Sequence, residues 1–480
     1  MKLPFTLFLL TFLFTGYQAK SQALLVHTGS SIKVENGTTL DITSGNLVLK
    51  SGATGDVSLI DLGAVTFSGG GHAEVERYLT HGKWHLISSP VASATASMFV
   101  GDYLQYFTES TNQFSDVVSI AAPLNIMQGY ALWTIDEIPS TEVFTGITNT
   151  GNHSRSFTQG GQGFNLMGNP YPSAIDWDEV AIPAELSGAF WLFDPTTGEF
   201  GEYKYYISGG GEANTTSQYI PSGQGFFVRS TGGSGTLVLS NASRAHSSQA
   251  FYKQKGADPT LLLKATGNNI TTQTAIRFNP SATAAVDRLF DVNKLTTNSP
   301  DVPVIYSMVG NEKMAINTLP SVQGNETVAV LFKAGLSGNY TLTASSLSTI
   351  DPSVPVFLED VSMNYFQDLR LNPDYGFAYV PYAEKEFKIH FREVTNINSP
   401  DQLSAPCFLT GNMLYVNFSD DFGISTQEAI ISVYSITGQL LLKVNTRDAF
   451  NSIPFKGSQS IYLVNLSTNR YTTTIKVFNQ

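Results

Sequence analysis

The chain has 480 residues, of which 42% are hydrophobic and only 14% are charged. This composition can build several packed cores and excludes a chain that is disordered throughout, and the length favours two to four domains. The 39 acidic residues outnumber the 27 basic ones and give a formal net charge of -12, which argues against a nucleic acid or an anionic membrane surface as the partner.

The first residues predict export. Lys2 precedes an apolar run over residues 3–14, and the small residues Ser21 and Ala23 satisfy the signal-peptidase rule. We therefore expect a signal peptide over residues 1–23 and a protein that is secreted or attached to the outer cell surface. No later segment reaches the roughly 20 apolar residues of a spanning helix, so no transmembrane anchor is expected. Cys407 is the only cysteine, which excludes an intramolecular disulfide.

Residues 24–72 alternate short apolar stretches with glycine, serine and threonine, as in SIKVENGTTL and VSLIDLGAVTF. Alternation with period two, interrupted by a glycine every few residues, is typical of short strands that turn every eight to ten residues. We predict the stacked rungs of a short β-solenoid. A meander of ordinary hairpins is the alternative.

Residues 73–248 contain one motif twice. WHLISSP, which begins at Trp84, corresponds to FNLMGNPYP, which begins at Phe164, and each is followed by a Gln-Gly-aromatic run, QGYALW after the first and QGFFV after the second. The order is the same in both copies and only the intervening loop differs in length, as loops allow. The repeat predicts a duplicated β domain with copies at about 73–150 and 151–248.

Strand patterns continue to the end of the chain. Runs such as TVAVLF and YTLTA predict a β-sandwich over residues 259–394, and a segment rich in proline and asparagine predicts a linker over 395–406. Five or more strand patterns in residues 407–480 predict a small immunoglobulin-like sandwich. The fold class expected for the whole chain is therefore all-β and multidomain.

Several of these segments resemble the multidomain surface proteins that Bacteroidetes-type bacteria export by the type IX secretion system. The similar residues are Arg77-Tyr78 before WHLISSP, the GNPYPS run with Asp176-Trp177-Asp178, the DRLFDVNKL segment, and Thr437-Gly438, Ile453-Pro454 and IYLV in the last module. Ser460 departs from the glycine that is usual before the Ile-Tyr pair. The resemblance implies a C-terminal sorting domain at 407–480, with the type IX machinery as its partner. It implies no activity.

Candidate chemistry is sparse, and we assign no catalytic residue. No HExxH, GxSxG or lysine-bearing P-loop occurs, and the glycines at 209–211 suit a flexible loop better than a phosphate cradle. Trp177 with its neighbours Asp176 and Asp178 is the candidate glycan-binding site, because an indole face packs on a pyranose. The alternative is a turn in which Asp176 caps a short helix. Trp84 and Trp133 are expected in the core, because the second copy has Phe164 and approximately Val228 at the corresponding positions.

Asp287, Asp291 and Asn293 could supply oxygen ligands to a cation such as Ca²⁺, although no EF-hand pattern follows and a salt-bridged loop is the alternative. No other cofactor is expected. The interpretation that follows is an exported, non-catalytic adhesin or structural protein of the cell surface or extracellular space. One alternative is a carbohydrate-binding surface protein whose partner is an extracellular glycan or surface polymer. The other is a secreted hydrolase, which would need carboxylates or a metal cluster meeting in one cleft.

Overall fold

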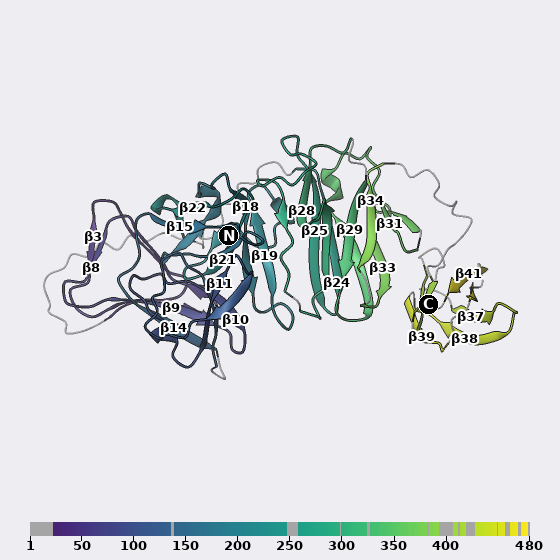
Figure 1. The fold of residues 1–480 in the computed structure, drawn as a ribbon, viewed down its shortest axis with the longest axis horizontal. Coiled ribbons are helices and arrows are strands. Elements are labelled where there is room, and N and C mark those ends of the chain that lie inside the picture. Colours follow the sequence, from purple (N-terminus) through teal and green to yellow (C-terminus); the bar gives the residue numbers. More distant parts are fainter. Residues whose placement is uncertain are drawn as a thin grey trace, which may run out of the picture.

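The computed structural model describes residues 23–478 except 136–138, 247–257, 298, 324–326, 364, 382–383, 393–406, 411–412, 419–427, 449, 457–460 and 469–471. The predicted signal peptide, apart from Ala23, and the predicted linker over 395–406, lie outside the described residues. The described chain is all-β, and its helices are single 3-10 turns of three or four residues. The all-β, multidomain prediction is confirmed, and the units follow one another along the longest axis (Figure 1).

The strands and 3-10 turns of the N-terminal region and the duplicated domain are β1 (Leu24–Val26), β2 (Ser31–Val34), β3 (Thr39–Asp41), β4 (Leu47–Leu49), β5 (Ser51–Gly52), β6 (Gly55–Asp56), β7 (Ser58–Asp61), β8 (Ala64–Thr66), β9 (Ala73–Leu79), β10 (Trp84–Ile87), η1 (Ala96–Phe99), β11 (Tyr103–Thr108), β12 (Gln113–Asp116), β13 (Tyr130–Trp133), β14 (Ser140–Gly146), β15 (His153–Phe157), β16 (Phe164–Gly168), β17 (Ala174–Asp176), η2 (Trp177–Glu179), β18 (Leu186–Asp194), β19 (Glu202–Ile207), η3 (Gly211–Ala213), β20 (Tyr219–Ile220), β21 (Gly225–Ser230), β22 (Gly235–Leu239), η4 (Asn241–Ser243) and β23 (Arg244–Ala245).

Those of the C-terminal half are β24 (Thr260–Gly267), β25 (Ile270–Phe278), β26 (Val292–Asn293), β27 (Val304–Val309), β28 (Glu312–Leu319), β29 (Thr327–Lys333), β30 (Gly338–Ser345), η5 (Leu347–Thr349), β31 (Phe357–Asp360), β32 (Tyr365–Asp368), β33 (Asp374–Tyr379), β34 (Lys385–His390), β35 (Cys407–Thr410), β36 (Met413–Asn417), β37 (Ala429–Ser435), β38 (Leu440–Thr446), β39 (Phe450–Pro454), β40 (Ile461–Ser467) and β41 (Thr472–Phe478).

The N-terminal region is a short solenoid of parallel strands. Three faces repeat from rung to rung: β1 pairs with β4, β2 with β7, and β3 with β8, each in parallel. The first face continues into the next domain, because β4 also pairs in parallel with β9. Leu47 and Leu49 are buried between these rungs. Antiparallel hairpins of the alternative meander would have paired sequence neighbours instead, so the strand pairing matches the solenoid prediction.

The duplicated domain repeats one topology. The first copy has a four-stranded antiparallel sheet in the order β10-β13-β11-β12, and the second has the order β16-β21-β18-β19. Numbered along the chain, both orders are 1-4-2-3. Each copy also pairs the strand before its sheet with the strand after it, β9 with β14 and β15 with β22. The repeat therefore extends well beyond the motif visible in the sequence.

The two copies pair with each other through the backbone of their repeated motifs. Ile87 bridges to Gln224 of the second copy, and Met167 bridges to Gln128 of the first. One residue further on, the Ser88 N–H donates to the Gly223 carbonyl at 2.9 Å, and its counterpart, the Gly168 N–H, donates to the Met127 carbonyl, also at 2.9 Å. The motif strand of each copy thus ends on the Gln-Gly strand of the other, which explains why both elements recur together.

A buried ion pair fastens the solenoid to the second copy. The guanidinium of Arg244 lies 2.5 Å from the Asp61 carboxylate, with the two side chains 0% and 2% exposed. Arg244 also donates to the Leu59 carbonyl at 2.7 Å and to the Ser173 hydroxyl at 3.1 Å, and it lies over the ring of Tyr171. Because a buried charge without its partner is costly, these contacts fix the relative position of the two units.

Residues 260–390 form one continuous sheet rather than two facing ones. In the described residues, ten strands follow the order β32-β31-β34-β29-β27-β28-β25-β24-β30-β33, and an eleventh, β26, pairs with β28. The sheet curls until it is nearly closed: the Tyr365 and Tyr375 rings stack at 5.8 Å, and the Gln367 amide donates to the Asn372 carbonyl and to that of Asp374, the first residue of β33. We call this unit the barrel. Strong twist and alternating burial, as in Thr327–Lys333, allow one sheet to enclose a core on its own.

The described residues of the C-terminal module form a sandwich of seven strands. A sheet β35-β36-β39 faces a sheet β38-β37-β40-β41 across a core that includes Leu414, Ile431 and Val464. The strand number and size match the predicted immunoglobulin-like sandwich. In the described part of the chain no helix has the length and apolar character needed to cross a membrane.

Candidate functional site

Trp177, the predicted sugar-contact residue, belongs to the core of the second copy. Its side chain is 2% exposed, and its indole N–H donates to the Gly188 carbonyl at 2.8 Å. The rings of Phe190 and Phe226 pack against it at centroid distances of 5.3 and 5.8 Å. A stacking platform needs an exposed ring face, and this ring offers none. The prediction of a glycan contact at Trp177 is therefore corrected: the residue closes a core.

Asp176 and Asp178 stabilise a turn, which was the alternative to a glycan site in the sequence analysis. The Asp176 carboxylate accepts from the Asp178 N–H at 3.1 Å and caps η2. The Asp178 carboxylate accepts from the Tyr206 hydroxyl at 2.9 and 3.0 Å. Burial, together with the neighbouring carboxylates, raises the pKa of Asp176. Both groups hold the turn after β17 and are not directed around a common ligand with Trp177.

The predicted cation ligands are engaged with the protein itself. The Asp291 carboxylate accepts from the N–H groups of Asp287 and Thr318, both at 2.7 Å, while the Asp287 carboxylate accepts from the Thr283 N–H. The Asn293 amide nitrogen donates to Glu312 at 3.0 Å. Burial raises the pKa of Asp291 to about 6. The group organises a loop, and among the described residues no three His, Cys, Asp or Glu side chains converge as a metal site would require.

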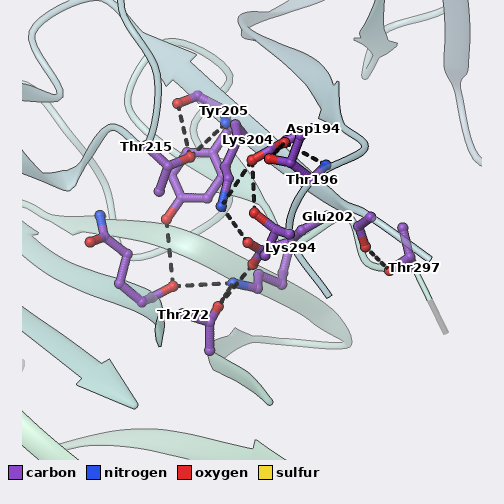
Figure 2. Close-up of polar contacts among 12 residues, drawn as sticks. Asp194, Thr196, Glu202, Lys204, Tyr205, Thr215, Thr272, Lys294 and Thr297 are labelled. Carbon is purple, nitrogen blue, oxygen red and sulfur yellow. Dashed lines mark hydrogen bonds and ion pairs between the residues drawn. The ribbon is translucent and has the colours of Figure 1, made fainter. Parts of the chain in front are cut away.

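A charged cluster lies at the joint between the second copy and the barrel (Figure 2). Glu202 and Lys204 come from β19, Asp194 from the end of β18, and Thr272 from β25 of the barrel. Lys204 lies 2.5 Å from Glu202 and 4.0 Å from Asp194. The Thr272 hydroxyl donates to the other oxygen of Glu202 at 3.2 Å, which carries the network across the joint.

Lys294 extends this cluster from the barrel side. Its ammonium donates to the Thr272 hydroxyl at 2.9 Å and to the Gln273 carbonyl at 3.2 Å, and it lies 6.0 Å from the centre of the Tyr205 ring. Burial lowers the pKa of Lys294 to about 8, with Lys204 acting in the same direction and Glu202 opposing them. The cluster thus contains an amine whose charge is expensive to keep.

The contacts around this cluster are those of a joint. The Trp191 indole N–H, next to it on β18, donates to the Asn293 carbonyl at 3.1 Å. One apolar core also runs through both units, combining Trp191 and Phe227 of the second copy with Leu262 and Ile316 of the barrel. Glu202 and Lys294 are 92 residues apart in sequence (294 minus 202), so no local motif could have indicated them.

Two tryptophans expected in the core are partly exposed. Trp84 and Trp133 face each other across β10 and β13, and their rings meet edge to face at 5.6 Å. The strand register corrects the equivalence used in the sequence analysis, because Trp84 corresponds to Phe164 and the residue opposite Phe164 is Arg229 rather than Val228. Trp133 therefore occupies the place of an arginine that pairs with Glu312 of the barrel.

The comparisons with known proteins give a family but no activity. A family model described as a domain of unknown function (DUF8693) matches residues 11–391. The match ends directly after β34, so the C-terminal module lies outside it. No curated protein matches the chain.

Proposed function

The chain belongs to the family described as a domain of unknown function (DUF8693), and we propose that it is an exported, non-catalytic protein of the cell surface or extracellular space, with an adhesive or structural role. The residues matched by the family model would be the working part. The C-terminal sandwich would be a sorting module read by the type IX secretion machinery.

The observation that carries this proposal is the division of the chain at residue 391. Before it, the solenoid, the two copies and the barrel are tied by shared cores and by the buried Arg244–Asp61 pair. After it comes a module with a core of its own, including Val416 and Val433, that the family model does not cover. The module touches the barrel, where Phe450 lies against Gly376 of β33, but its core is made of its own residues, as a cleavable sorting signal requires.

The multiply tied body also supports a scaffold role. Buried polar groups in it are used to join units: Arg244 holds the solenoid, and Glu202 with Thr272 holds the barrel. Such contacts favour a fixed arrangement of surfaces along the molecule, which suits a protein that spans or presents rather than one that closes around a substrate.

Fractionation of the producing cells tests the proposal. The intact mass of the protein in the surface and medium fractions is compared with that of a chain truncated after Ser399. We expect an external mature form that ends near residue 400, while the truncated chain stays in the periplasm. Persistence of the full chain to Gln480 on the outside, or normal export of the truncated chain, would make the last sandwich a working domain and contradict the sorting role.

A further inference from the structure

An aromatic row crosses the sheet of the first copy. In the strand register Trp84 of β10 lies opposite Trp133 of β13, and Trp133 lies opposite Tyr103 of β11. Residues opposite each other on neighbouring strands share a face, so the three rings form one line across three strands. Tyr103 is 61% exposed, and both indoles are partly exposed. We refer to these three residues as the aromatic row.

The row is the open margin of a face that is otherwise covered. Gln105 and Phe107 follow Tyr103 on the same face of β11, each two residues further along. The Phe107 ring packs edge-on against Phe227 of the second copy, with the ring centres 5.0 Å apart. Ala131, opposite Gln105, is buried in the core shared with the second copy. The face therefore runs from a buried half that receives an aromatic ring to a margin at which Trp84 packs on the edge of that core, Trp133 is half-buried and Tyr103 is exposed.

The second copy uses the corresponding positions differently. Phe164 and Arg229, which correspond to Trp84 and Trp133, lie at the contact with the barrel. Phe164 is buried, and Arg229 forms an ion pair with Glu312 of the barrel at 3.0 Å. In the first copy the arginine is replaced by Trp133, which cannot make that ion pair, and the neighbouring Tyr103 is left exposed. Where the second copy has an ion pair to the barrel, the first copy therefore has the aromatic row.

Hydrogen-bonding groups lie beside the rings on the same face. Gln105 is opposite Asp116 on β12, and its amide nitrogen donates to the Asp116 carboxylate at 2.8 Å. Asp116 is exposed, so its second oxygen and the Gln105 carbonyl can accept hydrogen bonds from a ligand. The surface therefore combines flat apolar groups with an amide and a carboxylate.

We propose that the aromatic row binds a neutral oligosaccharide, a role beyond the proposed export and surface function. Indole and phenol faces pack on the apolar faces of pyranose rings, while Asp116 and Gln105 accept from their hydroxyls. Neighbouring strands are about 4.8 Å apart, so successive rings are spaced comparably to successive sugars of a chain. The net charge of -12 disfavours an anionic polymer. Three side chains are also far fewer than the roughly 20 to 30 residues per side of a stable protein interface.

Binding of neutral hexasaccharides to the purified full chain tests this inference. The probes are β-1,4-glucan, β-1,3-glucan, β-1,4-xylan, β-1,4-mannan and chitin oligomers. Binding of each is measured by calorimetry and by the change in tryptophan fluorescence. We expect at least one to bind and to perturb the fluorescence. Tyr103→Ala and Trp133→Ala should each weaken that binding roughly tenfold or more, which is about 1.4 kcal/mol. Trp133→Phe, which keeps a ring, should retain most of it.

Tyr106→Ala is the matched control, because Tyr106 is an exposed tyrosine of the same strand on the opposite face. Its binding should equal that of the unmodified chain. The inference is overturned if no hexasaccharide binds, or if binding survives loss of Tyr103 and Trp133 together. Sedimentation of the same variants covers the other occupant: self-association that Tyr103→Ala abolishes would make the row a contact between copies of the chain. None of these outcomes depends on cleavage or export.

Discussion

Gly129 of the first copy lies directly against the Met167 carbonyl of the second. A Cβ atom at position 129 would stand 2.4 Å from that oxygen and 2.7 Å from the Leu166 side chain. At the equivalent glycine, Gly225, an added Cβ atom would stand 3.0 Å from the Ile87 carbonyl oxygen and 3.1 Å from the Ile87 nitrogen of the first copy. Each Gln-Gly pair is therefore the place where one copy accepts the end of the other copy's motif strand, and the glycine is required by that approach.

Gly129→Ala should destabilise the duplicated domain. The added methyl group has to push the Met167 carbonyl away, which costs about 2 kcal/mol, a value typical of overpacked sites. The expected result is a lower urea midpoint for the transition of this domain, followed by tryptophan fluorescence.

Two further glycine variants calibrate that result. Gly225→Ala meets its neighbours at longer distances and should cost less than Gly129→Ala. Gly338→Ala, where the nearest atoms are 4.0 Å away, should change the midpoint little. Equal effects at positions 129 and 338 would contradict the tight approach of the two copies.

The sequence predicted the units better than their contacts. Alternation and glycine spacing indicated the solenoid, and the repeated WHLISSP-type motif located the duplication, because both patterns are local. Whether the strands after residue 259 form two sheets or one nearly closed sheet depends on twist and on contacts such as Tyr365 with Tyr375, which no strand pattern encodes. The Arg244–Asp61 pair joins residues 183 positions apart (244 minus 61), so it is equally invisible in the sequence.

Glu109 should make the contact between the two copies sensitive to acid. Its carboxylate accepts from the N–H groups of Gly160 at 2.7 Å, Gly161 at 2.7 Å and Gly163 at 2.9 Å, all in the second copy. Burial opposes the charged form, but these donors and the Thr158 hydroxyl outweigh it and lower the pKa of Glu109. A lowered pKa means that the stabilisation is present above the ordinary glutamate pKa and is lost as the pH falls through the folded-state value.

Glu109→Gln is the variant that exposes this dependence. At neutral pH it should cost about 1 to 2 kcal/mol, because a charge-assisted acceptor is replaced by a weaker one at a site partly screened by solvent. Below about pH 4 the difference from the unmodified chain should shrink, since protonated Glu109 has lost the same advantage. A difference that stays constant from pH 7 to pH 3, measured by urea unfolding at each pH, would show that the carboxylate charge contributes nothing.

Lys294 should make the free energy of unfolding depend on pH in the alkaline range. Its pKa in the folded chain is about 8, below the ordinary lysine value of 10.5, because burial penalises the ammonium. The folded state therefore binds fewer protons than the unfolded state between these values, so this residue's contribution makes unfolding less favourable as the pH rises from 8 to 10.5. Lys294→Met removes the titration. The free energy of unfolding of the unmodified chain, minus that of the variant, should rise across this interval.

Lys264→Met provides the background for that measurement, because Lys264 is a partly buried lysine on β24 of the same barrel. Its curve over the same pH range gives the effect of replacing a lysine by methionine on this barrel and is subtracted from that of Lys294→Met. Parallel curves for the two methionine variants would mean that the joint does not depress the charge of Lys294.

Trp177 was predicted as an exposed sugar contact, and there is a physical reason why the structure buries it. Trp177 is flanked by Asp176 and Asp178, and acidic neighbours suggested a loop in water, yet the two carboxylates hydrogen-bond within a turn whose indole is buried in the core. Trp133 was assigned to the core by aligning it with a valine. Aligning the two Gln-Gly runs without a gap gives Arg229 as its counterpart, and the pairing of β16 with β21 agrees. The residues next to a tryptophan in sequence indicate its local backbone structure. The exposure of its side chain depends on which other strands pack against it.

Truncation of the two tryptophans should separate these roles. Trp177→Ala removes a side chain that is 2% exposed, together with its hydrogen bond to Gly188, and should cost about 3 to 5 kcal/mol, the range for large aromatic residues in cores. Trp133→Ala leaves no enclosed cavity and loses mainly the edge-to-face contact with Trp84, which is worth about 0.5 to 1.5 kcal/mol. Thermal unfolding followed by circular dichroism should therefore rank Trp177→Ala far below Trp133→Ala. Similar losses for both would place Trp133 in a core and remove the surface on which the aromatic row depends.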